Sequence, residues 1–262
     1  MEDHHVYKFS YDSEEDALKS LANYHNVSVD IIKFKFPDIN HIIKQNIEIG
    51  SQTDIGILIF QIQALLKPRL HDNCDKFKVY FYHRCGSKGE SWFKEGLLNS
   101  FDGLDSLITK INVLISNPLD HSTIENLKYK LRERHSYEEQ RRDKSGVFGF
   151  FRLEDAIHHS NESFDLAEVF LDIKDSFDTK KDFDKFYNSI KLELDSTVVK
   201  FYVEWSVCEL DYLVYWYWRL LCQKFDEVQS IGAGMDVGRG HTIPCEQIEK
   251  IIYLNRKEES KV

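Results

Sequence analysis

A run of four β-forming residues places the strongest demand on the fold. Residues 79–82 read Val-Tyr-Phe-Tyr with no polar residue between them, a pattern typical of a strand buried on both faces. His83 and Arg84 follow where this strand should leave the core. Residues 86–89 contain two glycines and should end the strand, and Ser91 should cap a short helix. A polar pair at the end of an apolar strand is a common support for a functional site. The structural alternative is that His83 only caps the strand.

Composition predicts a folded protein with a sizeable core. The chain has 262 residues, of which 42% are hydrophobic and 13% aromatic, enough to exclude disorder as the default. Its formal net charge of −10 argues against a general binder of nucleic acids or anionic membranes and leaves room only for a local basic patch.

The cysteines and the apolar segments predict a cytoplasmic location without a membrane partner. Five cysteines are scattered without a C-x-x-C pair, which fits a reducing compartment better than a disulfide framework. The first nine residues lack the basic and apolar regions of a secretory signal. The most apolar long segment, residues 198–221, is interrupted by charged side chains, so it should lie in a soluble core.

Residues 1–70 are predicted to form a helical N-terminal region. Residues 17–32 should form two short helices with a turn at His25-Asn26. This spacing is faintly similar to a helix-turn-helix, but no basic recognition face follows it. Pro37 should close this unit, and residues 55–66 should form a buried helix.

Residues 71–262 are predicted to form a mixed α+β domain. The expected helices are residues 104–115 and 152–159 and a last helix opening at Ile243; the expected strands are residues 147–151, 197–205 and 227–231. Residues 212–221 fit either a strand or a buried helix. The charged residues 123–142 fit a solvated helix or loop, with a phosphate-bearing ligand as the alternative.

The sequence gives little support for a metal site or for a nucleotide-binding loop. The eleven histidines include the adjacent pairs His4-His5 and His158-His159, and adjacent side chains rarely bind one ion. No metal site is therefore predicted. The glycine-rich residues 232–240 lack a Walker lysine, so we do not interpret them as a nucleotide loop.

Three segments, in chain order, carry a further pattern. They are Tyr82-His83-Arg84 followed by Trp92 and Gly96-Leu97-Leu98; Gly146-Val147-Phe148; and Glu227 followed by Ile243-Pro244 and the spaced residues Ile248 and Ile251 or Ile252. These segments resemble motifs of the ADP-ribosyltransferase superfamily, in its poly-ADP-ribose-polymerase-like and DarT-like branch. The resemblance implies a small split β-sheet with flanking helices that grips NAD in a cleft, preceded by the helical N-terminal region.

The resemblance also implies roles for single residues. Glu227 would supply the catalytic carboxylate, with Glu204 as the alternative, because cleavage of the nicotinamide bond passes through an oxocarbenium-like state. His83 would hydrogen-bond the nicotinamide ribose. Phe148 would stack on the nicotinamide ring, although an aromatic core position is the structural alternative.

The resemblance implies that arginines contact the cofactor at two places, the nicotinamide slot and the pyrophosphate. Arg84 would border the nicotinamide slot, and Arg152 or the Arg141-Arg142 pair would hold the pyrophosphate. The expected function is an NAD-dependent ADP-ribosyltransferase, or an NAD glycohydrolase, acting on an unidentified protein or nucleic acid. The alternative is a non-enzymatic cytoplasmic interaction protein or defence-associated regulator whose acidic surface binds another protein.

Overall fold

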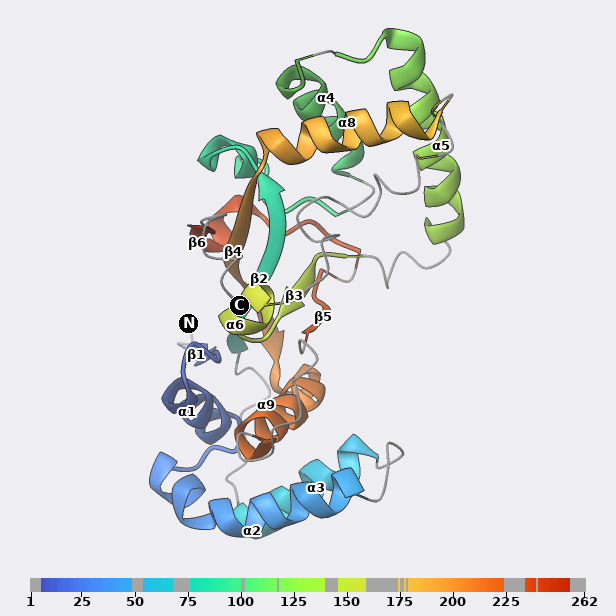
Figure 1. Ribbon diagram of the computed structural model, residues 1–262. Coiled ribbons are helices and arrows are strands. Elements are labelled where there is room, and N and C mark those ends of the chain that lie inside the picture. Colours follow the sequence, from blue (N-terminus) through green and yellow to red (C-terminus); the bar gives the residue numbers. More distant parts are fainter. Residues whose placement is uncertain are drawn as a thin grey trace, which may run out of the picture. The chain divides into compact units, whose positions relative to one another are not determined.

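The protein is a mixed α+β chain in the computed structural model (Figure 1). The structure describes residues 6–48, 54–67, 76–99, 102–116, 118–139, 146–158, 174, 177, 179–223, 234–238 and 240–254. Within these ranges, six strands form one sheet in the order β5-β3-β2-β4-β6, and β1 pairs with β2. The expected α+β class is thereby confirmed.

The chain divides into two compact units. The first contains Met1–Phe81 and Tyr202–Ala233, and the second contains Tyr82–Phe201 and Gly234–Val262. The division differs from the boundary near residue 70 that the sequence suggested. One reason is that helix α9 (Asp211–Gln223), far along the chain, packs against the N-terminal helices.

Both long strands contribute to both units. The boundary between the units divides strand β2 (Lys76–Ser87) after Phe81. It divides strand β4 (Asp195–Ser206) after Phe201. The predicted strands at residues 79–82 and 197–205 are therefore confirmed, but both are longer than expected. Strand β2 continues through Gly86 to Ser87, where the Ser87 and Thr197 hydroxyls lie 2.8 Å apart in a buried hydrogen bond.

The first unit contains three N-terminal helices, α1 (Glu14–Tyr24), α2 (Val29–Glu48) and α3 (Ile55–Leu66). The predicted turn at His25-Asn26 is confirmed, and Asn26 has a left-handed φ of 48°. The predicted end at Pro37 is wrong, because Pro37 lies inside α2. Ile32, before the proline, and Ile39, after it, are both fully buried, so packing holds the helix together across the missing hydrogen bond.

The N-terminal region that the sequence predicts to be helical also contains a strand, because Val6–Phe9 form β1, parallel to β2. Phe9 stacks on Tyr217 of α9 with ring centroids 4.7 Å apart and meets Phe77 of β2 edge to face. This aromatic packing buries Phe9, the last residue of β1, in the core of the first unit. A four-residue strand is too short to show a clear period in the sequence.

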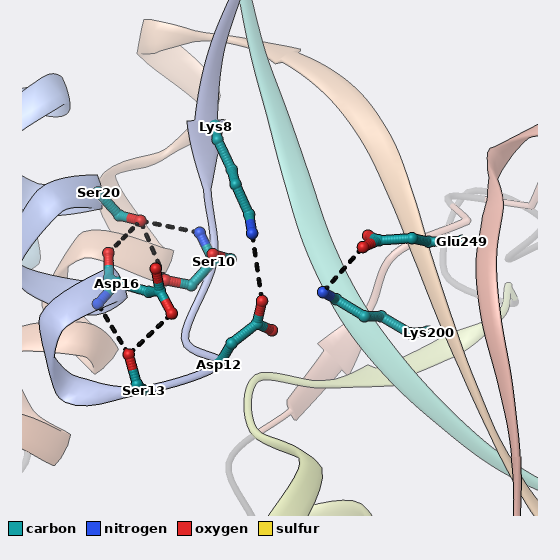
Figure 2. A network of polar contacts seen from close by, with 8 residues as sticks. All are labelled: Lys8, Ser10, Asp12, Ser13, Asp16, Ser20, Lys200 and Glu249. Atoms are coloured by element: carbon teal, nitrogen blue, oxygen red, sulfur yellow. Dashed lines mark hydrogen bonds and ion pairs between the residues drawn. The ribbon is translucent and has the colours of Figure 1, made fainter.

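A serine network joins β1 to α1 (Figure 2). Ser13 caps the helix by accepting a hydrogen bond from the Asp16 amide at 3.1 Å. The Ser20 hydroxyl accepts from the Ser10 amide at 2.8 Å and lies 3.0 Å from the Ser10 carbonyl. The chain leaving β1 therefore has its main-chain polar groups satisfied at the start of α1.

The second unit contains the remaining helices and the short strands. Its elements are α4 (Leu104–Leu114), α5 (His121–Glu139), α6 (Leu153–His158), α8 (Lys180–Glu193), β3 (Phe148–Phe150), β5 (Gly234–Asp236) and β6 (Ile248–Tyr253), with a 3₁₀ turn at Glu90–Phe93. Helices α4, α5 and α8 share one apolar cluster that includes Ile111, Leu127 and Phe186.

The expected last helix is wrong. After Pro244, only a 3₁₀ turn forms at Cys245–Gln247, and the chain then enters β6, antiparallel to β4. Ile251 and Ile252 face Val199 and Val198 across this ladder, and β-branched side chains suit such a pleated surface. Lys200 of β4 also pairs with Glu249 of β6 at 3.3 Å (Figure 2).

The sequence left open whether residues 212–221 form a strand or a helix. Residues 212–221 belong to helix α9, which excludes the strand alternative. The expected strand at residues 227–231 lies outside the described residues. In the part of the chain that the structure describes, no helix has both the length and the hydropathy needed to cross a membrane.

Candidate functional site

The first two of the three segments meet in the second unit. Strand β3 pairs antiparallel with β2, and Tyr82 lies opposite Phe150. The Nδ1 atom of His83 lies 2.8 Å from the main-chain carbonyl of Phe148. The segment with the Tyr-His-Arg step and the segment with Phe148 are therefore neighbours in space.

The third segment joins the other two at two places. Strand β5 pairs with β3, so that Asp236 lies opposite Phe148. Leu97 and Ile243 exchange two main-chain hydrogen bonds, each of 2.9 Å. The Gly-Leu step of the first segment therefore contacts the Ile-Pro step of the third directly.

Gly96 permits this close approach. Its φ is +86°, and a Cβ built on it would lie 2.0 Å from the Ile243 carbonyl oxygen. The buried Asn99 side chain adds a hydrogen bond of 2.8 Å to the Gly240 carbonyl. A side chain at position 96 would force the two segments apart, because backbone atoms cannot yield as a flexible side chain can.

His83 is held in its neutral form with a defined tautomer. A carbonyl oxygen only accepts hydrogen bonds, so Nδ1 must carry the proton that it donates to Phe148. Burial lowers the pKa of His83, and the hydrogen bond to the Phe148 carbonyl opposes this shift only in part. The Nε2 atom is consequently a hydrogen-bond acceptor.

The Phe148 ring packs with a different set of neighbours. It lies beside a cluster of Tyr82, Phe150, Ala156 and Val198 and meets the Phe150 ring edge to face at 5.1 Å. Successive side chains of a strand point to opposite faces, which separates His83 from its neighbour Tyr82. His83 thus contacts the main chain of Phe148, and the expectation that its imidazole and the Phe148 ring share one ligand stays a prediction.

Arg84 and Arg152, two of the candidate arginines, bind groups within the chain. Arg84 is only 6% exposed and donates to the Ile157 carbonyl at 2.7 Å, next to the C-terminal end of α6, where a cation is favoured. Arg152 forms two hydrogen bonds with the buried Asp155 carboxylate, at 2.6 and 2.8 Å. A pyrophosphate would have to compete with Asp155 for the Arg152 guanidinium.

The contacts above do not include the remaining candidates. Glu227 and the Arg141-Arg142 pair are outside the described residues. Glu204 belongs to the first unit, where it is exposed and lies 3.9 Å from Lys76. The roles of both carboxylates stay predictions.

Asp236 is a carboxylate near the three joined segments that was not predicted from the sequence. It is half-buried on β5, opposite Phe148. Strands β5 and β2 flank β3, so their main chains are about 10 Å apart. The only signal in the sequence was a short Met-Asp-Val step between glycines, which is too brief to indicate a strand.

Helix α5 (His121–Glu139) contains the described part of the charged residues 123–142. On this helix, Lys128 and Arg132 lie 3.9 and 3.6 Å from the Asp105 carboxylate of α4. Two of the cations that a phosphate would need are therefore already paired with a carboxylate. Such surface ion pairs are usual on an ordinary solvated helix.

Comparisons with known proteins add no relative: no family model, no curated protein and no solved structure matches the chain. Within the described ranges, no group of three or more histidine, cysteine, aspartate or glutamate side chains is arranged to hold a metal ion.

The environment of His83 predicts an acid-sensitive step in stability. Its pKa in the folded chain lies below the ordinary value of 6.5, so at falling pH the unfolded chain takes up a proton that the folded chain resists. The free energy of unfolding should therefore fall as the pH drops through 6.5, and level off below the folded-state pKa.

The test is urea unfolding followed by circular dichroism between pH 5 and pH 8, for the wild type and His83→Gln. A glutamine amide can still donate to the Phe148 carbonyl but does not titrate, so the variant should lose less stability in acid. Equal losses in the two proteins would contradict this assignment, because all other histidines are shared.

The Gly96 contact predicts a large difference between two glycine substitutions. Gly96 and Gly89 both have positive φ, but a Cβ on Gly89 meets nothing within 4 Å. Alanine at either position should cost about 1–2 kcal/mol for its backbone conformation. Gly96→Ala should cost about 1–3 kcal/mol more, because it also overpacks against Ile243. Equal midpoints in urea for the two variants would show that the segments are not in contact.

Proposed function

We propose that the second unit binds NAD and acts as an ADP-ribosyltransferase or an NAD glycohydrolase. The observation that carries the proposal is the meeting of three distant segments through the contacts of His83 with Phe148, Phe148 with Asp236, and Leu97 with Ile243. These are the same three segments whose residues resemble the motifs of the superfamily. We extend the proposal to the finer fold, a split sheet of the ADP-ribosyltransferase type.

His83 is suited to the role that the resemblance implies. Its Nε2 atom is an acceptor because Nδ1 donates to Phe148. A ribose hydroxyl is a donor, so a neutral imidazole at this place can orient the nicotinamide ribose without adding positive charge. A cation there would oppose the positive charge that develops when the nicotinamide bond breaks.

The reaction also needs a carboxylate to stabilise the oxocarbenium-like state. Glu227 remains our candidate, and Asp236 is a second one because its strand borders β3. The acceptor would be a protein or a nucleic acid, and the site of action would be the cytoplasm.

A second candidate function is a non-enzymatic interaction protein. The observation that favours it is that Arg84 and Arg152 already bind the α6 carbonyls and the Asp155 carboxylate. In this case the three segments would form a structural core only, and NAD would have no site.

Thermal unfolding with NAD distinguishes the two functions. A ligand that binds only the folded chain stabilises it by about 2.7 kcal/mol at 100 times its Kd, so millimolar NAD should raise the Tm. His83→Ala should reduce this shift, whereas Glu125→Gln, an exposed carboxylate on α5, should leave it unchanged. No shift at millimolar NAD would contradict the transferase and favour the interaction protein.

Labelled NAD then identifies the reaction. Transfer of label to protein or nucleic acid in a lysate indicates a transferase, and release of nicotinamide without labelling indicates a glycohydrolase. Glu227→Gln and Asp236→Asn should be compared in this assay. The substitution that abolishes turnover while keeping the Tm shift identifies the carboxylate.

A further inference from the structure

Helix α3 has an apolar outer face that does not take part in the core of the first unit. Its twelve residues include no charged side chain. Leu58, Ile59, Ile62 and Leu66 are buried on the inner side, where α3 packs against α2 and α9. On the outer side, Ile57 and Phe60 remain 55% and 69% exposed.

This face departs from what a surface helix normally shows. A helix at the edge of a soluble core places charged residues on its outer side. Here the outer side carries Ile57, Phe60, Gln61 and Ala64, and residues three and four apart on a helix are direct neighbours. Two large exposed apolar side chains at neighbouring positions of one helix indicate an interaction surface rather than a scattered surface residue.

We infer that this face binds a second copy of the chain through an antiparallel α3 pair. If a two-fold axis passes between Phe60 and Gln61, Ile57 of each copy lies level with Ala64 of the other. Large side chains then face small ones, an arrangement that lets two surfaces interdigitate. The two Phe60 rings flank the axis and provide most of the apolar area to be buried.

The charges at the ends of α3 favour the same arrangement. Asp54 caps the N-terminal end, accepting a hydrogen bond from the Gly56 amide at 2.8 Å, and the exposed Lys67 ends the helix in a left-handed conformation. In the antiparallel pair, each Asp54 lies level with Lys67 of the other copy, so opposite charges meet at both ends. The helix between them is uncharged, so two chains that each have a net charge of −10 meet there without like charges facing each other.

Sedimentation equilibrium of the full chain over a wide range of concentration tests this inference. The wild type should show a reversible monomer–dimer equilibrium. Phe60→Glu would bury two like charges beside the axis and should raise the Kd by about tenfold or more. Circular dichroism should show an unchanged fold, since Phe60 is mostly exposed.

Phe34→Glu is the matched control. Phe34 lies on α2 and is 78% exposed, so this variant makes the same chemical change on a different helix and should dimerise like the wild type. A wild type that stays monomeric at every concentration would overturn the inference and leave the face to another partner. A Phe60→Glu variant that dimerises like the wild type would overturn it as well.

A charge substitution tests the antiparallel direction. Lys67→Asp would place two carboxylates level with each other at both ends and should weaken the dimer. Adding Asp54→Asn keeps a capping oxygen but removes the repulsion, so the double variant should recover most of the lost affinity. An unchanged Kd in Lys67→Asp would exclude this pairing.

Discussion

The two main-chain hydrogen bonds between Leu97 and Ile243 are the contact on which the account of the second unit depends. Buried amide and carbonyl groups must find partners, and this exchange satisfies both residues at once. Gly96 allows the approach, and Asn99 strengthens it by binding Gly240, 141 positions along the chain. Together with the contact between His83 and the Phe148 carbonyl, the bridge joins segments that a linear sequence keeps far apart.

Strand β2 connects this contact to the rest of its unit. Phe77, Val79 and Phe81 are buried in its first half, and Tyr82 and Arg84 in its second, so the buried side changes where the two units divide. The second half supports α6 through Arg84 and leaves His83 partly buried with its Nε2 atom as an acceptor. A rigid strand with satisfied neighbours is a suitable support for a binding residue.

Much of the fold follows from patterns in the sequence, and the failures have physical reasons. The bounds of α3 were predicted correctly because Ile55–Leu66 is apolar and Lys67 precedes a proline. The strand at Val6–Phe9 was missed because it is short and depends on aromatic contacts with α9. The segment after Pro244 has residues that suit a helix start, yet Ile251 and Ile252 pair with β4 instead, a partner that local propensity does not reveal. For the candidate site, the sequence singled out three segments, and the structure shows that they contact one another. The sequence did not reveal that Arg84 binds α6 or that Arg152 pairs with Asp155, because such contacts depend on tertiary packing.

Amide hydrogen exchange at Leu97 and Ile243 tests the central contact most directly, because both amides donate across the bridge. If the two segments meet as described, both amides exchange slowly and with similar opening free energies, like a single cooperative unit that includes the amides of β2. If Leu97 and Ile243 exchange at the rates of free peptides while β2 stays protected, the segments do not meet, and the proposed NAD site has no structural basis.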